Sequence, residues 1–105
     1  MTKNEHNGWT NYETWIVKLW IDNEEGSYNY WREEAEHFSQ NDNVYGLSKA
    51  LESEHSEALP ELQGFASDLL NAAMSEVNWY EIAQSMIDDY KANHPEQVSE
   101  QEAEA

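Results

Sequence analysis

The chain of 105 residues has no cysteine, two prolines, four glycines, and only five basic residues against 22 acidic ones. Without cysteine it can form neither disulfides nor thiolate metal sites, which favours a cytoplasmic location. Its formal net charge of -17 repels DNA, RNA and anionic lipid, so we expect neither direct nucleic-acid binding nor membrane binding. No segment approaches the roughly 20 apolar residues of a membrane span. The first eight residues lack the apolar run of a signal peptide.

The aromatic content predicts a folded chain despite this charge. High net charge with low mean hydropathy is typical of disorder, and self-repulsion opposes a compact state. Five tryptophans, six tyrosines and two phenylalanines are more than a disordered chain carries, and they need a core in which to pack. The length suits one domain, so we expect one folded core with an acidic surface.

Helix start signals divide the chain into segments. Thr10-Asn11-Tyr12-Glu13 fits a capping box, and Asn78-Trp79-Tyr80-Glu81 places a cap and a glutamate in the same way. Ser27 is a suitable N-cap for a second helix, and Pro60 suits the first position of a fourth. A third helix is expected from Val44 until just before that proline.

Apolar residues recur at helical spacing in all five segments, and no segment alternates with period two. The sequence therefore predicts an all-α fold, a compact bundle of four or five helices over residues 9–92. We expect a flexible arm at residues 1–8 and a disordered acidic tail at residues 93–105. The predicted inward residues are, in chain order, Tyr12, Trp15, Ile16, Leu19, Trp20; Tyr28, Trp31, Ala35, Phe38; Val44, Leu47, Ala50, Leu51, Ala58; Leu62, Phe65, Ala66, Leu69, Leu70, Ala73; Ile82, Ala83, Met86, Ile87 and Tyr90.

Two blocks carry a family resemblance. Gly8-Trp9-Thr10-Asn11-Tyr12-Glu13-Thr14-Trp15, running on to Leu19–Gly26, resembles the opening of small uncharacterised acidic proteins from phages and plasmids, which have an Asn-Tyr-Glu-Thr-Trp block. Residues 68–83 are similar to the C-terminal block of those proteins. The resemblance implies a mobile-element setting, often near anti-defence genes, and it implies no catalytic residue. We interpret the matching residues as helix caps and core.

Acidic residues are the candidate binding groups. Residues 9–92 contain 17 acidic and 4 basic residues, a net charge of -13, so the charge is not confined to the tail. Carboxylates one helical turn apart lie about 5–6 Å from each other and could imitate rows of phosphates. We therefore expect a basic nucleic-acid-binding protein as partner, in the manner of an anti-restriction or anti-CRISPR DNA mimic. The predicted partner-binding residues are Glu24, Glu25, Tyr30, Glu33, Glu34, Glu36, Asp42, Glu52, Glu54, Glu57 and Glu61.

Other interpretations of the same residues remain open. The carboxylates could form an ordinary solvated face. Exposed aromatics such as Tyr30 and Tyr80 could instead anchor a protein partner in a regulatory module, or a homodimer.

A metal site is a weaker alternative. The pairs Glu34/His37 and Glu52/His55 have the Glu-x-x-His spacing of di-iron helical bundles, with Glu13 and Glu81 as further carboxylates. With 100° per residue, His37 and Glu52 point away from the apolar face, so we expect no metal and no other cofactor. The sequence contains no Ser-His-Asp arrangement, phosphate-binding glycine loop or HExxH motif. It therefore predicts a protein that is not an enzyme.

Overall fold

Short polar side chains begin most of the helices. The structure is a computed structural model that describes residues 5–94. Within them the asparagines Asn11, Asn43 and Asn78 accept hydrogen bonds from backbone amides of the first turns of α1, α3 and α5. The five helices are α1 (Tyr12–Asn23), α2 (Glu25–Ser39), α3 (Val44–Glu57), α4 (Gly64–Ser75) and α5 (Trp79–Asn93).

The predicted all-α bundle is confirmed. The described residues form five helices, and their β-structure is limited to an isolated bridge between His6 and Trp9. None of these helices is long and apolar enough to span a membrane. The second helix begins at Glu25 rather than after Ser27, because the Glu24 carboxylate caps it through the amides of Gly26 and Ser27.

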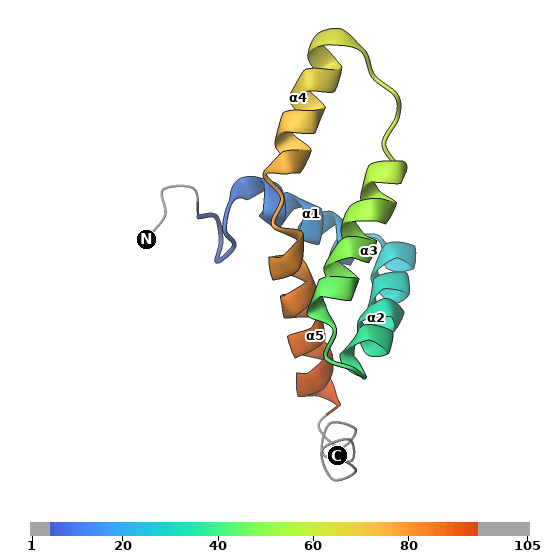
Figure 1. The fold of residues 1–105 in the computed structure, drawn as a ribbon. Helices are drawn as coiled ribbons and strands as arrows, with labels where there is room; N and C mark the ends of the chain where they lie inside the picture. Colours follow the sequence, from blue (N-terminus) through green and yellow to red (C-terminus); the bar gives the residue numbers. More distant parts are fainter. Residues whose placement is uncertain (1–4, 95–105) are drawn as a thin grey trace.

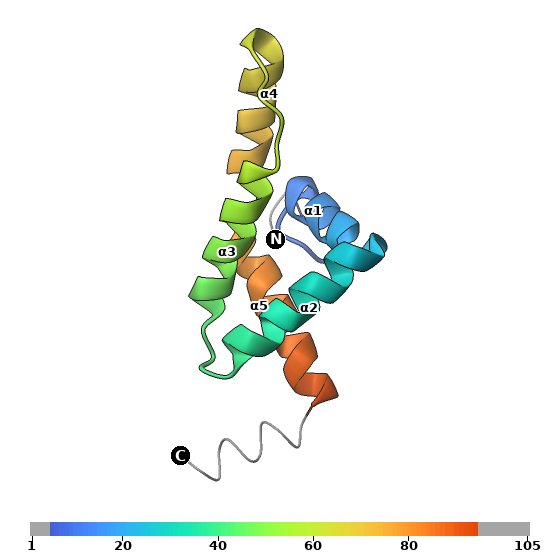
Figure 2. The same ribbon diagram turned by 90° about the vertical axis from the view of Figure 1, so that its right-hand side faces the viewer.

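Helix α5 occupies the centre of the bundle. It packs against α2 and α3, and α1 crosses behind them (Figures 1 and 2). The inward face predicted for α5 is confirmed, since Ile82, Ala83 and Ile87 are fully buried and Met86 and Tyr90 nearly so. The remaining core comes from the other helices and the residue before the α5 cap, namely Ile21, Trp31, Ala35, Val44, Leu47, Leu51, Val77 and Trp79.

The face predicted for α1 was wrong. Thr14 and Ile21 are buried and Val17 packs on the core, whereas Tyr12 and Trp20 are 52% and 68% exposed. Apolar residues lie on nearly every side of this helix, so periodicity alone could not choose its inward face. Thr14 can be buried because its hydroxyl is hydrogen-bonded.

The prediction for α4 was also wrong. None of its residues is buried, and Phe65, Ala66 and Leu69 are exposed. The helix stands beyond the end of the bundle, where the connection from α3 arches over to it (Figure 1). Met74, near its C-terminal end, packs on the core. The predicted inward residues Tyr28, Ala58 and Leu62 are exposed as well.

The chain before α1 is more structured than expected of a flexible arm. His6 and Trp9 exchange two backbone hydrogen bonds of 2.9 and 2.8 Å around a tight turn. The His6 ring lies 4.5 Å from that of Trp15 and 5.1 Å from that of Tyr12, measured between centroids. Residues 5–8 therefore fold against α1. Residues 1–4 and the predicted tail beyond His94 lie outside the described part of the chain.

The first turns of α1 and α5 are bonded to each other. The Asn11 side chain accepts from the amide and hydroxyl of Thr14, at 2.9 and 2.6 Å, and donates to the Glu76 carbonyl at 2.7 Å. The Thr14 hydroxyl in turn accepts the amide of Asn78 at 2.8 Å. Asn11 and Thr14 are both buried.

A further bond closes this arrangement from the other side. The Glu81 carboxylate accepts the Thr10 amide at 3.0 Å, while its own amide is capped by Asn78 at 3.1 Å. We call these residues (Thr10, Asn11, Thr14, Glu76, Asn78 and Glu81) the cap junction. All six members belong to the two blocks that carry the family resemblance, and the hydrogen bonds between the two blocks join residues 64 to 71 apart in sequence.

We predict that Asn11→Ala costs about 2–4 kcal/mol of unfolding free energy. The substitution removes an N-cap, the acceptor of the buried Thr14 hydroxyl and the donor to the Glu76 carbonyl. The control is Asn43→Ala, which removes the cap of α3 alone and should cost about 1 kcal/mol. Urea denaturation followed by circular dichroism measures both. Equal losses in the two variants would contradict the role given to the cap junction.

Candidate acidic interaction surface

A tyrosine joins carboxylates across the contact between α2 and α3. The Tyr30 hydroxyl donates to the Glu54 carboxylate, 2.8 and 2.9 Å from its two oxygens. The Tyr30 ring stands edge-on to the buried Trp31 at 4.9 Å. The hydrogen bond to Glu54, followed by desolvation and by the charges of Glu54 and Glu34, raises the pKa of Tyr30 to about 12. Tyr30 therefore stays protonated at neutral pH and holds the Glu54 carboxylate in place.

Further carboxylates extend this surface on both helices. On α2, Glu33 is exposed and Glu34 half-buried, and Glu34 lies one turn after Tyr30 on the same side of the helix. On α3, Glu57 is exposed one turn after Glu54, on the same side of the helix. We call the set Tyr30, Glu33, Glu34, Glu54 and Glu57 the acidic face.

The other predicted partner-binding residues lie elsewhere. Glu24 caps α2, and Glu25 is exposed in its first turn. Glu36 is near Tyr90, where it adds to the desolvation that raises the pKa of that tyrosine. Glu52 pairs with Lys49 at 3.2 Å, and Glu61 is in the connection between α3 and α4.

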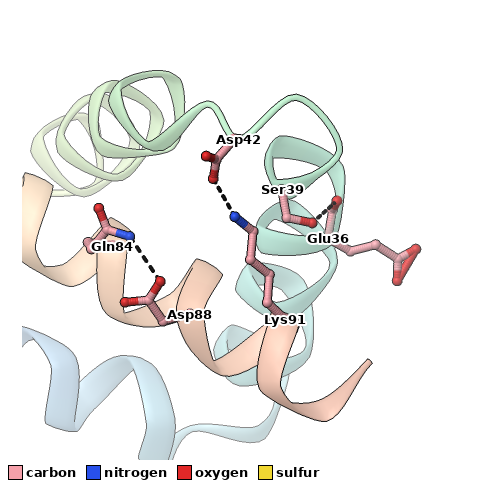
Figure 3. Close-up of polar contacts among 6 residues, drawn as sticks. All are labelled: Glu36, Ser39, Asp42, Gln84, Asp88 and Lys91. Carbon is pink, nitrogen blue, oxygen red and sulfur yellow. Dashed lines mark hydrogen bonds and ion pairs between the residues drawn. The ribbon is translucent and has the colours of Figure 1, made fainter. Parts of the chain in front are cut away.

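Asp42 is occupied at the lower end of the bundle. Its carboxylate forms an ion pair with the ammonium group of Lys91, which ties α5 to the turn between α2 and α3 (Figure 3). The Ser39 hydroxyl donates to the Glu36 carbonyl nearby, and the Glu36 carboxylate points away from the ion pair. The eleven predicted residues are therefore spread over several elements of the bundle, and five of them make up the acidic face.

Basic side chains do little to neutralise that face. Residues 5–94 contain 18 acidic and 4 basic residues, a net charge of -14. The three lysines among them pair with carboxylates outside the acidic face, Lys18 with Asp22 at 2.6 Å and the others as described above. The Arg32 guanidinium lies 5.9 Å from the centre of the Tyr28 ring and lines a cavity with residues of α1 and α5.

That cavity lies between α1, α2 and α5. Its volume is about 90 Å³, and its charged lining residues, Lys18, Arg32, Asp22 and Asp89, balance one another. A small space with balanced charge offers little selectivity for an ionic ligand. The strongest electrostatic feature of the described surface is therefore its excess of carboxylates.

The Glu-x-x-His pairs are not assembled into a metal site. The His55 ring lies between those of Trp31 and Trp79, 5.5 Å from each, and its Nδ1 is 2.7 Å from the Leu51 carbonyl. The His37 ring packs edge-on against Phe38. Within residues 5–94 no three acidic or histidine side chains are grouped so that they could hold a metal ion.

The fold and surface together define a small helical-bundle protein with a strongly acidic exterior. The chain belongs to a family of unknown function, DUF7249, whose profile matches residues 2–101. Comparison with curated proteins and with solved structures found no match. The family match covers nearly the whole chain, so the cap junction and the acidic face both lie within the family domain.

We predict that Glu54→Gln lowers the pKa of Tyr30 from about 12 towards its ordinary value near 10. The variant removes the charge of the main acceptor, while Glu57→Gln removes an equal charge that does not accept from Tyr30. Tyrosine ring-carbon chemical shifts followed against pH report the titration. Equal shifts in the two variants would show that the hydrogen bond is not the cause.

The same pKa predicts how stability depends on pH. Folding raises the pKa of Tyr30 above its value in the unfolded chain. The contribution of protonated Tyr30 to the free energy of unfolding is therefore complete below pH 10 and is lost between pH 10 and about 12. In Glu54→Gln that loss should be smaller.

Proposed function

We propose that this protein binds and inhibits a nucleic-acid-binding protein through the acidic face of α2 and α3, as a mimic of the phosphate backbone. The observation that carries the proposal is the Glu54 carboxylate, fixed by Tyr30 beside Glu34 and followed by Glu57 one turn later. A basic groove made to bind phosphates would accept carboxylates at that spacing.

Electrostatics supports fast association with such a partner. A net charge of -17 attracts a basic surface over distances up to the Debye length of about 8 Å in physiological salt. Steering of this kind raises association rates more than it raises final affinity. Fixed carboxylates add to it, since ordering Glu54 before binding reduces the entropy lost in the complex.

The sequence resemblance to phage and plasmid proteins supports a defence protein as the target. Restriction enzymes and CRISPR effectors both contain basic channels for duplex or heteroduplex nucleic acid. An inhibitor of such an enzyme would act in the cytoplasm. It would need no catalytic residue, because occupying the channel is sufficient.

Binding to a panel of restriction enzymes and CRISPR effectors, measured by biolayer interferometry, tests the proposal. We expect a complex that weakens steeply between low and high salt and that duplex DNA displaces. Binding that is insensitive to salt, or that persists in excess duplex, would contradict mimicry.

A charge-matched pair of variants locates the binding surface. Neutralising Glu33, Glu34 and Glu57 together to glutamine leaves the Tyr30–Glu54 hydrogen bond in place and should weaken the complex about tenfold or more. The control neutralises Glu5, Glu76 and Asp88, which are exposed outside the acidic face. It should have a much smaller effect, because it changes only the net charge. Equal losses would mean that net charge, rather than the acidic face, causes binding.

The alternative of an aromatic anchor makes a different prediction. Tyr30 is 42% exposed and lies in the middle of the acidic face. If its ring filled a pocket of the partner, Tyr30→Ala would weaken binding more than the triple glutamine variant does. Under the proposal the order of the two effects is reversed.

A further inference from the structure

Helix α4 presents an apolar face that no other described residue covers. Phe65 is 78% exposed, Leu69 59%, and Leu62 just before the helix 40%. Both views show α4 extending past the ends of α3 and α5, away from the bundle (Figures 1 and 2). Scattered single apolar residues on a surface are common, but a row of them on one protruding helix marks an interaction site.

The outward row has a regular spacing. Phe65, Leu69 and Ala72 follow one another at i, i+4 and i+7, and all three are exposed. The half-buried Leu70 is on another side of the helix, where it lines a hollow with Leu59 and Leu62 of the connection from α3. The connection therefore partly covers one side of α4 and leaves the outward row in solvent.

Helix α4 has little to stabilise it by itself. It contains 12 residues, and Gln63 at its N-cap position makes no capping hydrogen bond. Gly64 has a positive φ of 64°, a conformation that favours glycine. Isolated helices of this length are marginal in water, and packing of an apolar face is what stabilises them in proteins. Packing of its outward row against another surface would therefore stabilise the helix.

The distribution of charge indicates which kind of molecule can cover the outward row of α4. Asp68 is the one charged residue of α4, while α2 has four carboxylates and one guanidinium in 15 residues. Two copies of a chain with net charge -17 repel each other wherever their acidic surfaces meet. They can approach most easily through α4, whose one charge, Asp68, lies at the edge of the outward row. A basic partner, in contrast, is attracted to carboxylates that α4 lacks.

We propose that α4 pairs with α4 of a second copy of this chain, forming a two-fold dimer. The outward row of each copy packs on that of the other, and the small side chain of Ala72 allows close approach of the two helices. The inference is independent of the function proposed for α2 and α3, since the outward row belongs to α4 and the acidic face to the other two helices.

The size of the apolar row sets the expected strength. A stable interface buries roughly 800 Å² per partner, and a fully buried aromatic side chain accounts for about 150–250 Å² of it. One phenylalanine, one leucine and one alanine from each copy fall short of the standard size. The dimer is therefore expected to dissociate on the order of micromolar concentrations.

Repulsion between the two copies gives the dimer an unusual dependence on salt. Screening weakens the repulsion of the acidic surfaces and leaves apolar packing in place, so salt should strengthen the dimer. The complex with a basic partner has the opposite dependence. The two proposals can therefore fail separately.

Sedimentation velocity over a range of protein and salt concentrations tests the dimer. We expect a monomer of 12.2 kDa at low concentration, and twice that mass at high concentration, with the midpoint falling as salt rises. A monomer at all concentrations in about 1 M salt, where the Debye length is about 3 Å, would overturn the proposal.

Two variants and one control locate the interface. Leu69→Glu and Phe65→Ser should each raise the dissociation constant at least tenfold without changing the thermal midpoint of the monomer, because both side chains are largely exposed. The control is Tyr45→Ser, which removes a ring that is 65% exposed at the far end of α3. Dimers that persist in both α4 variants, or that are lost equally in the control, would overturn the assignment to α4.

Discussion

The cap junction is the constraint on which the rest of the fold depends. It joins the first turn of α1 to the first turn of α5 through buried side chains of Asn11 and Thr14, whose polar atoms are all satisfied within the pair of turns. Buried polar groups are costly unless they are paired, so this arrangement permits one relative placement of the two helices. Helices α2 and α3 then pack on a central α5 whose position is already set.

The junction also explains how the protein tolerates its charge. Caps and core use asparagine, threonine and aromatic residues, and the carboxylates that take part, Glu24 and Glu81, act at helix N-termini, where negative charge is favourable. The remaining carboxylates project from the outer sides of the helices. Repulsion among them is reduced by solvent and salt, whereas within residues 5–94 no buried polar side-chain atom lacks a hydrogen-bond partner.

Much of the fold could be predicted from the sequence, because α3 and α5 have apolar stripes next to polar sides and clear asparagine caps. The buried face of α1 could not be predicted, because apolar residues lie on nearly every side of this helix. In addition, the pattern of apolar residues does not include Thr14, which is polar and yet buried. Helix α4 has the same apolar spacing as a core helix, and spacing does not show whether the partner of that face belongs to the same chain. All five residues of the acidic face are among the predicted partner-binding residues, but their grouping depends on the contact of Tyr30 with Glu54, 24 residues away.

Amide chemical-shift mapping of the labelled protein with a bound nucleic-acid-binding protein tests the central claim most directly. We predict that the largest perturbations fall on residues 30–34 and 54–57, and that excess duplex DNA reverses them. Perturbations confined to α1 and α4, with those two segments unchanged, would contradict the account.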